Sequence, residues 1–373
     1  MAQLGRAIFF DSSLSASGRR SCASCHTPST AYASADLPVG SDGVVRTIPT
    51  LTYAYRAPNF GVGLDMNDVD EPPTTPPRSS VDRRDTKVAG AARADSMIAR
   101  GGLFWDGRVN TLQNQAMGPL FNPNEMGNRD AESVRDRLRH AAYSRRFVEL
   151  FGPAVFAQPS RVVDEAMFAV ARYQIEDSSF HSYDSKYDAY LEGRAKLSAS
   201  EWRGLQAFDD PKRGNCAACH VDRPRGDGLP PVFTDYEYEA LGVPNDTGRA
   251  RGAVDLGACG PLRTDLKTQS HFCGLFRTPS LRNVATRTRF FHNGVYRTLE
   301  DVLAFYNVRD TDPDRIYPAG SSLPQRYRGN LDTTDAPFGR ARGHPAMTDQ
   351  DMQDIVAFLR TLTDGYHAKP SKG

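Results

Sequence analysis

The spacing of apolar residues along the chain is typical of helices. Apolar side chains recur every three to four positions over 134–151 and over 162–174, which predicts amphipathic helices in both segments. Two further segments begin, at Ser198 and Thr348, with the capping-box pattern of a hydroxyl residue followed three positions later by an acidic one. This pattern predicts helix N-termini. Strand-like alternation is scarce, so we expect a mainly α fold with little β structure.

One long stretch lacks any apolar period. Residues 59–96 are rich in Pro, Asp, Arg and Ser, and we expect a loop there without a core of its own. The whole chain of 373 residues is long enough for two to three domains. No run approaches the roughly 18 apolar residues needed to span a bilayer.

The charge of the chain is nearly balanced. The 46 Lys and Arg residues against 45 Asp and Glu leave a net charge of +1, which indicates neither a nucleic-acid-binding surface nor a disordered acidic tail. The first residues, MAQLGRAIFFD, lack the basic and apolar regions of a secretory signal. If the protein is exported, we expect its signal to be absent from this chain.

Four of the six cysteines lie in two copies of the pattern Cys-x-x-Cys-His. The copies consist of Cys22, Cys25 and His26, and of Cys216, Cys219 and His220. Each residue type has a role in attaching haem c, because the two thiols form thioethers and the histidine ligates the iron from the proximal side. A zinc site usually brings such pairs within about 20 residues of each other, and a redox dithiol needs no following histidine. The sequence therefore predicts two covalently bound haem c groups.

The two remaining cysteines, Cys259 and Cys273, bear on the cellular compartment. Haem c is attached outside the bacterial cytoplasm, where disulfides persist, so we expect a periplasmic protein. In that compartment Cys259 and Cys273 are expected to form a disulfide. It would fix the loop that leads into the segment over the distal side of the second haem. The alternative is a pair of buried free thiols.

The same order of short motifs occurs twice in the chain. GRAIFFD, CASCH, IPTL and FWDG in the first half correspond to GLQAFDD, CAACH, TPSL and FHNG in the second, and in both halves Thr-Leu begins four residues after the last glycine. This repetition predicts two haem domains related by internal duplication. We place the N-terminal cytochrome c-like domain at 1–151, a bridging helical segment at 152–197 and the C-terminal domain at 198–373.

The repeat also indicates what lies over each iron. Pro119 and Tyr306 each follow the last glycine of the repeat by twelve residues. If the two positions are equivalent, a phenol closes the second haem, whereas the first faces a proline that cannot ligate iron and keeps its pocket tight. Met347, Met352 and His292 are rival sixth ligands for the second haem. A tyrosine packed in the core is the other interpretation of Tyr306.

Polar groups for chemistry at an open first haem come from the same segment. No histidine occurs between His26 and His140, which leaves Gln115 and Glu125 near the first distal position. A carboxylate there can take a proton from hydrogen peroxide and return it to the distal oxygen, although Glu125 is alternatively a solvated loop residue. Trp105 lies in the duplicated segment, where its ring can carry electrons between the haems; the alternative is a core tryptophan.

These motifs resemble those of the bacterial dihaem cytochrome c peroxidase and MauG superfamily over nearly the whole chain. The matching segments include SCASCHTP, GGLFWDGRVNTL, NPNEM, NCAACH, FTDYEYEALGVPND and TPSLRNVATRTRFFHNGV. The resemblance implies a mainly helical protein of two cytochrome c-like domains. It places a high-spin peroxidatic haem in the N-terminal domain and an electron-transfer haem in the C-terminal domain.

Within this superfamily the predicted haem ligation resembles that of the MauG type. Typical peroxidases have a methionine at the position of Tyr306 and a removable histidine over the first haem, whereas the MauG type has a tyrosine and an open first haem. The likeness assigns Gln115, Pro119 and Glu125 to the first pocket. It makes Trp105 the bridge and implies a bis-ferryl state in which both irons share the oxidising equivalents.

The calcium site of the superfamily is poorly matched. MauG-like proteins hold calcium between the haems, partly through an asparagine whose position here is Thr47, and the C-terminal contribution falls near Arg287 and Arg289. These cations are unfavourable neighbours for a calcium ion, although backbone carbonyls remain as ligands. The departures argue against calcium without excluding it.

Together these features predict a periplasmic dihaem peroxidase that reduces hydrogen peroxide to water at the first haem. Electrons would come from a small c-type cytochrome or a cupredoxin, through a second haem ligated by His220 and Tyr306, and on through Trp105. Two alternatives remain open: a MauG-type enzyme that oxidatively modifies tryptophan in a partner protein, and an electron-transfer dihaem cytochrome without catalysis. A high-spin haem in the resting ferric protein would argue against the last.

Overall fold

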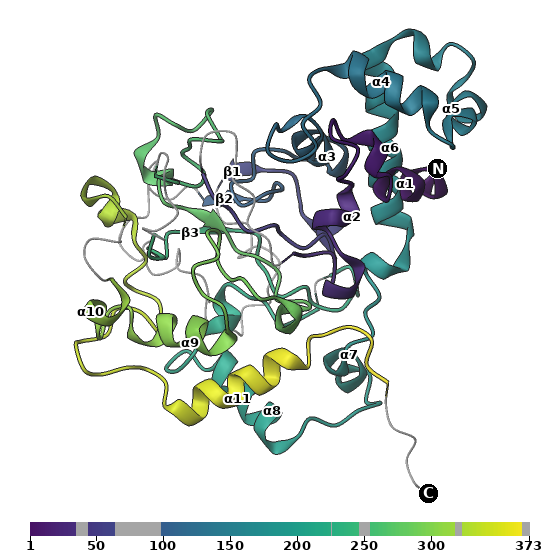
Figure 1. The fold of residues 1–373 in the computed structure, drawn as a ribbon. Helices are drawn as coiled ribbons and strands as arrows, with labels where there is room; N and C mark the ends of the chain where they lie inside the picture. The colour runs from purple at the N-terminus through teal and green to yellow at the C-terminus, as the bar shows by residue number, and fades with distance from the viewer. Residues whose placement is uncertain (35–43, 64–97, 225, 246–253, 318–322, 368–373) are drawn as a thin grey trace, which may run out of the picture.

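The computed structural model describes residues 1–34, 44–63, 98–224, 226–245, 254–317 and 323–367, and in these the chain is mainly helical, as predicted (Figure 1). The α-helices are α1 (Ala2–Phe9), α2 (Cys22–Cys25), α3 (Leu112–Phe121), α4 (Ala131–His140), α5 (Ser144–Phe151), α6 (Pro159–Glu176), α7 (Lys186–Leu191), α8 (Ala199–Asp209), α9 (Leu299–Val308), α10 (Pro313–Ile316) and α11 (Asp349–Arg360). None of the described helices is long and apolar enough to cross a membrane.

The strands of the described residues form two small antiparallel sheets, in agreement with the prediction of little β structure. One sheet pairs β1 (Gly61–Gly63) with β2 (Ile98–Arg100), and the other pairs β3 (Tyr238–Glu239) with β4 (Phe276–Arg277). The loop predicted over 59–96 is therefore wrong for 61–63, because three residues are too few to show alternation and their partner strand is distant in sequence. Residues 64–96 lie outside the described part of the chain.

The predicted capping boxes are present, but one predicted helix is divided. Ser198 and Thr348 accept hydrogen bonds at the N-termini of α8 and α11, and their backbone amides donate in return to the carboxylates of Glu201 and Asp351. The segment 134–151 forms α4 and α5, because the chain becomes extended at the C-cap of α4. The apolar period continues across this break since both helices pack into the same core.

In the two largest hydrophobic cores of the described residues, a glycine lies where two helices cross. In the first core α1 packs on α6, and a Cβ on Gly5 would lie 1.8 Å from the carbonyl oxygen of Ala169. In the second α8 packs on α11, and a Cβ on Gly204 would lie 1.9 Å from the carbonyl oxygen of Asp354. The two glycines come from GRAIFFD and GLQAFDD, so the sequence repeat is also a repeat of helix packing.

The helices of the segment predicted as a bridge, 152–197, pack in both of the large cores, and the domain bounds themselves stay a prediction. Helix α6 lies within the first core, and Tyr187 of α7 belongs to the second. In Figure 1 the helices of the first core lie at the upper right, and α7, α8, α9 and α11 lie below, with the small strands β1 to β3 to the upper left of centre.

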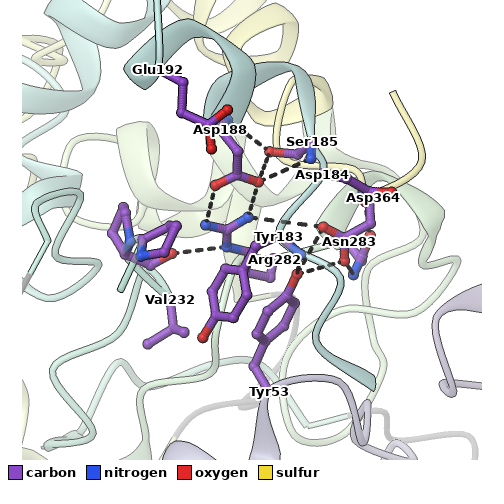
Figure 2. Close-up of polar contacts among 12 residues, drawn as sticks. Tyr53, Tyr183, Asp184, Ser185, Asp188, Glu192, Val232, Arg282, Asn283 and Asp364 are labelled. Atoms are coloured by element: carbon purple, nitrogen blue, oxygen red, sulfur yellow. Dashed lines mark hydrogen bonds and ion pairs between the residues drawn. The ribbon is translucent and has the colours of Figure 1, made fainter. Parts of the chain in front are cut away.

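A buried polar cluster joins the two halves of the chain (Figure 2). The hydroxyl of Tyr53, in the first half, donates to Asp364 at 2.8 Å from either carboxylate oxygen. The guanidinium of Arg282 pairs with Asp188 and lies 5.1 Å from the ring centroid of Tyr53. These residues come from four separate segments of the chain. The cluster therefore holds the segment of Tyr53, in the first half, against three segments of the second half.

Candidate haem sites

The first Cys-x-x-Cys-His motif forms a short helix that ends at a well-held histidine. Cys22 and Cys25 stand at the two ends of α2. The Nδ1 atom of His26 lies 2.8 Å from the carbonyl oxygen of Tyr32. A carbonyl only accepts hydrogen bonds, so Nδ1 carries the proton and Nε2 keeps a lone pair for a metal. Burial lowers the pKa of His26 to about 4, which keeps the ring neutral.

The second motif repeats this arrangement. Cys216 begins a short 3₁₀ turn that Cys219 caps, and Nδ1 of His220 lies 3.0 Å from the carbonyl oxygen of Phe233. Burial again lowers the pKa of the histidine to about 4. Each histidine is therefore neutral, oriented by a backbone carbonyl, and able to bind iron through Nε2.

Each motif faces a large apolar cavity. The cavity at His26 has a volume of about 150 Å³ and that at His220 about 190 Å³, each far above the roughly 15 Å³ that one water molecule requires. Apolar side chains dominate both linings; examples are Phe9, Leu14, Leu51, Leu120, Met167 and Val170 in the first and Phe208, Leu241, Leu281, Val284, Leu303 and Leu359 in the second. Two such cavities are sites for large apolar groups rather than defects of packing.

A half-buried arginine supports the fit of a haem in the second cavity. Arg287 lines it, and its Nη2 donates to the carbonyl of Ser280 at 3.0 Å, whereas its Nε is buried without a hydrogen-bond partner. Burial lowers its pKa to about 10. A desolvated cation of this kind is stabilised by an anionic partner, and a haem carries two propionates. The thiols, the neutral histidines, the apolar walls and this cation fit the predicted haem groups.

The helices over the two cavities carry different residues at the same position. Thr111 and Thr298 cap α3 and α9 in the same way, and Pro119 and Tyr306 are each the eighth residue of their helix. Pro119 lines the first cavity and Tyr306 the second. Burial raises the pKa of the Tyr306 phenol well above its usual range.

Of the three rival ligands predicted for the second haem, two line the second cavity. Met347 and His292 line the second cavity, whereas Met352 is not part of its lining. The His292 ring stacks on Phe276 with a centroid separation of 3.6 Å and an interplanar angle of 8°. Of Tyr306 and its three rivals, Tyr306 is the residue on α9, the helix that is equivalent to α3 at the first cavity.

Glu125 and Gln115 line the first cavity together with His26 and Pro119. Burial raises the pKa of Glu125 above its usual range, although a hydrogen bond from Asn122, 2.6 Å from Oε1, opposes the rise. A raised pKa makes this carboxylate a stronger base than an exposed one. Glu125 is half-buried at this lining, and its role as an acid and base stays a prediction.

Trp105 lines both cavities. Its indole Nε1 donates to the carbonyl oxygen of Thr47 at 2.9 Å, and its own carbonyl accepts from the amide of Arg277 at 2.9 Å. The ring therefore stands at the wall between the two sites, in one fixed orientation.

The two cysteines outside the motifs form a disulfide between Cys259 and Cys273. The loop that they close leads into β4, whose Phe276 and Arg277 line the second cavity. The backbone is thus held just ahead of the TPSL segment, in the place that the sequence analysis expected.

Sequence reasoning missed several polar residues around the first cavity. Asn122 holds Glu125, and Arg46, Arg108 and Arg20 also line the cavity. A local signal existed for Asn122, which begins the NPNEM motif, and for Arg108 in FWDGR. For Arg46 there was none, because its partners are far away in sequence.

Comparison with known proteins finds relatives over nearly the whole chain. A family model described as di-haem cytochrome c peroxidase matches residues 1–196. The chain is 33% identical to the methylamine utilization protein MauG of Paracoccus denitrificans, with 98% of this chain and 88% of that protein aligned. The crystal structure of the diheme peroxidase BthA from Burkholderia thailandensis has a TM-score of 0.81 and 35% identity, covering 97% of this chain and 86% of that one. A MauG-like protein associated with microbial copper homeostasis has a TM-score of 0.62 and 27% identity, covering 97% and 89%.

Proposed function

The chain belongs to the di-haem cytochrome c peroxidase family, and from this premise we propose that it reduces hydrogen peroxide to water at the first pocket, with electrons delivered through the second. One observation carries the proposal: α3 and α9 stand over equivalent cavities, but carry Pro119 and Tyr306 at the same helical position. Proline offers no group that binds a metal. The first pocket is therefore the one that admits peroxide.

Both pockets would hold their haem through the residues of the repeated motif. Cys22 and Cys25 would attach the first haem, with His26 as the proximal ligand. The equivalent residues of the second motif would attach the other haem, between His220 and Tyr306. When bound, the first haem would supply an iron that reacts with peroxide, and both haems would store and transfer electrons.

Glu125 serves as the acid and base of the reaction. It takes the proton from the near oxygen of hydrogen peroxide and delivers it to the far oxygen, which then leaves as water. The complete reaction consumes two electrons and two protons for each peroxide and yields two molecules of water. Gln115 lines the same cavity, where its amide can orient the peroxide, and Pro119 narrows the space over the iron.

Electrons reach the first pocket by way of Trp105, whose indole lines both cavities. The donor is a small c-type cytochrome or a cupredoxin, and the protein works in the periplasm, where haem c is attached and where the Cys259–Cys273 disulfide is stable. Pro119, at the position equivalent to Tyr306, would not have to leave an iron in the first pocket, so we expect the fully oxidised protein to be active without prior reduction.

The test is hydrogen peroxide consumption by the fully oxidised holoprotein, with and without an artificial electron donor, while the visible and near-infrared spectrum is recorded. Fast turnover that depends on the donor and needs no pre-reduction supports the proposal. A protein without high-spin haem that does not react with peroxide would be an electron-transfer cytochrome instead.

A second candidate function is oxidative modification of tryptophan in a partner protein. Tyr306, at a cavity-lining position of α9, and the likeness to MauG favour it. The same experiment separates the two functions, because a long-lived oxidised state with little turnover in the presence of donor would point to protein modification.

Replacement of Tyr306 by methionine should change the spectrum of the second haem. A thioether is a neutral ligand, whereas a phenolate stabilises the oxidised iron, so we expect Tyr306→Met to raise the reduction potential of that haem and to shift its visible and near-infrared bands. The matched control is Tyr296→Phe, since Tyr296 packs on Phe291 but is not part of the cavity lining. An unchanged spectrum in Tyr306→Met would disprove the ligand assignment.

Replacement of Trp105 by phenylalanine should separate the oxidation kinetics of the two haems. Phenylalanine keeps the ring volume in part but is much harder to oxidise, and it loses the hydrogen bond to Thr47. We expect rapid mixing with peroxide to show oxidation of the first haem followed by a slower change at the second. Trp202→Phe is the control, since this half-exposed tryptophan lies on α8. Rapid sharing in Trp105→Phe, as in the control, would rule out the bridge.

A further inference from the structure

The wall between the two pockets is formed by a short segment and one aromatic ring. Residues 47–49 and Trp105 line both cavities. The indole of Trp105 donates to the carbonyl of Thr47, and the amide of Thr47 donates to the carbonyl of His292 at 2.7 Å. The orientation of the indole therefore depends on how Thr47 is held.

Arg46, directly before this segment, bridges the chain segments on both sides of the wall. Its Nη1 donates to Oδ2 of Asp106 at 2.7 Å, and its Nε and Nη2 donate to the two carboxylate oxygens of Asp255 at 2.7 Å each. Asp106 is the residue after Trp105, and its side chain is completely buried, while that of Arg46 is 10% exposed. The bidentate contact fixes the plane of the guanidinium. Arg46, the residue before Thr47, is thus tied to Asp106, the residue after Trp105.

Each carboxylate of this network is paired with at least one arginine. Asp106 also accepts hydrogen bonds from Arg108 at 2.8 and 3.1 Å, and its carbonyl accepts one from Arg263 at 2.9 Å. Burial alone would raise the pKa of Asp255, but the hydrogen bonds and charge of Arg46 outweigh burial and hold that pKa below its usual value. A buried network that is paired in this way resists rearrangement, since breaking any pair leaves an uncompensated charge.

The calcium ion that the resemblance places between the haem sites does not fit these residues. Among the residues that the structure describes, no group of three or more His, Cys, Asp or Glu side chains is arranged to hold a metal ion. The two carboxylates nearest to Thr47 in the network are already bound by Arg46, and Arg287 and Arg289 line the second cavity. A calcium ion here would displace one guanidinium and lie near others.

We propose that the guanidinium of Arg46 takes the structural place of a divalent ion and positions Trp105 between the two pockets. Arg46 is a positioning residue, which acts through Asp106 and Thr47 rather than by contact with reacting atoms. The consequence for electron transfer rests on the proposed role of Trp105. The positioning of the indole by Arg46 does not depend on that role. It is therefore tested by the hydrogen bond of the Trp105 indole and not by peroxide turnover.

The experiment uses the holoprotein with Trp202→Phe, in which Trp105 is the single remaining tryptophan of the two in the chain. Ultraviolet resonance Raman spectroscopy then reports the strength of the hydrogen bond from the Trp105 indole N–H. We expect less than stoichiometric calcium by metal analysis and an indole band unchanged by a chelator. Arg46→Ala should shift the band to that of a weaker hydrogen bond, and millimolar guanidinium ion should restore it.

Two further variants keep the test decisive. Arg46→Lys retains the charge without the bidentate contact and should give an intermediate shift, which also serves if Arg46→Ala does not fold. Arg203→Ala is the control, because Arg203 pairs with Asp354 in the second core with half of its side chain exposed, and it should leave the indole band unchanged.

Stoichiometric calcium in the protein that retains Arg46, or a band shift on chelation, would overturn the proposal. So would an unshifted band in both Arg46→Ala and Arg46→Lys. Peroxide turnover, measured separately on the same samples, decides the proposed function. If the Arg46 variants lose turnover but their indole band is unshifted, the positioning role alone is contradicted. If the parent protein is inactive but the Arg46 variants show the expected band shift, the proposed function alone is contradicted.

Discussion

Replacement of Glu125 by glutamine is expected to slow peroxide turnover by roughly 10² to 10⁴, the usual contribution of a positioned acid or base. The amide has almost the same size as the carboxyl group, so it can keep the hydrogen-bonding position beside Asn122 and preserve the cavity. It cannot take a proton from peroxide. The loss should therefore appear in the bond-cleavage step and not in the haem spectrum of the resting protein.

The pH dependence gives this prediction a second readout. Glu125 must be ionised to take a proton, and burial raises its pKa above the usual value. The rate of peroxide reaction should therefore fall as the pH falls through this raised pKa, and Glu125→Gln should lack that acid limb. Glu149→Gln is the control, since its exposed carboxylate lies on α5 in an ion pair with Arg145. Normal turnover with an unchanged pH profile in Glu125→Gln would exclude the acid-base role.

The repeat in the sequence predicted more of the site than the hydrophobic pattern did. Counting from the last glycine of each copy located Pro119 and Tyr306, and the structure places both at the eighth position of equivalent helices beside the two cavities. This was possible because the helix cap, the helix and the cavity are set by residues close together in sequence. Duplication then supplied the comparison that one sequence alone otherwise lacks.

What the sequence could not predict depends on contacts between distant segments. Asp255 meets Arg46 across more than two hundred residues, and no local pattern marks that pair. The split between α4 and α5 was hidden because both helices face one core. Likewise Met352, whose sulfur accepts a hydrogen bond from Asn307, looked as suitable a ligand as Met347 until packing placed it outside the cavity lining.

Replacement of Asp188 by alanine is expected to lower the free energy of unfolding by about 3–5 kcal/mol, because it leaves a buried charge without its partner. The side chains of Asp188 and Arg282 are both completely buried. Two guanidinium nitrogens of Arg282 donate to the carboxylate oxygens at 2.5 and 2.7 Å, and Nε donates to the carbonyl of Pro231 at 2.8 Å. Figure 2 shows how Tyr53 and Tyr183 flank this cation, so water cannot readily replace the lost carboxylate.

The same pair should make the protein sensitive to acid. Burial by itself would raise the pKa of Asp188, but the hydrogen bonds and charge of Arg282 outweigh it and lower the pKa in the folded state. The stabilisation is therefore complete above the unfolded-state pKa of about 3.9 and is lost as the pH falls through the lower folded value. Urea unfolding of the holoprotein as a function of pH, followed by far-ultraviolet circular dichroism, should show this contribution in the parent chain and not in Asp188→Ala.

Two comparisons decide whether the unpaired charge is the cause. Arg360→Gln removes an ion pair with Glu300 in which both side chains are more than half exposed, and it should cost less than about 1 kcal/mol. The double variant Asp188→Leu with Arg282→Met removes both charges and should recover part of the stability lost in Asp188→Ala. A cost in Asp188→Ala as small as that of the surface variant would mean that Arg282 finds another partner. If the double variant is instead less stable than Asp188→Ala, the stabilisation comes from the contacts of Arg282 with Pro231 and the two tyrosines, and not from its charge pair.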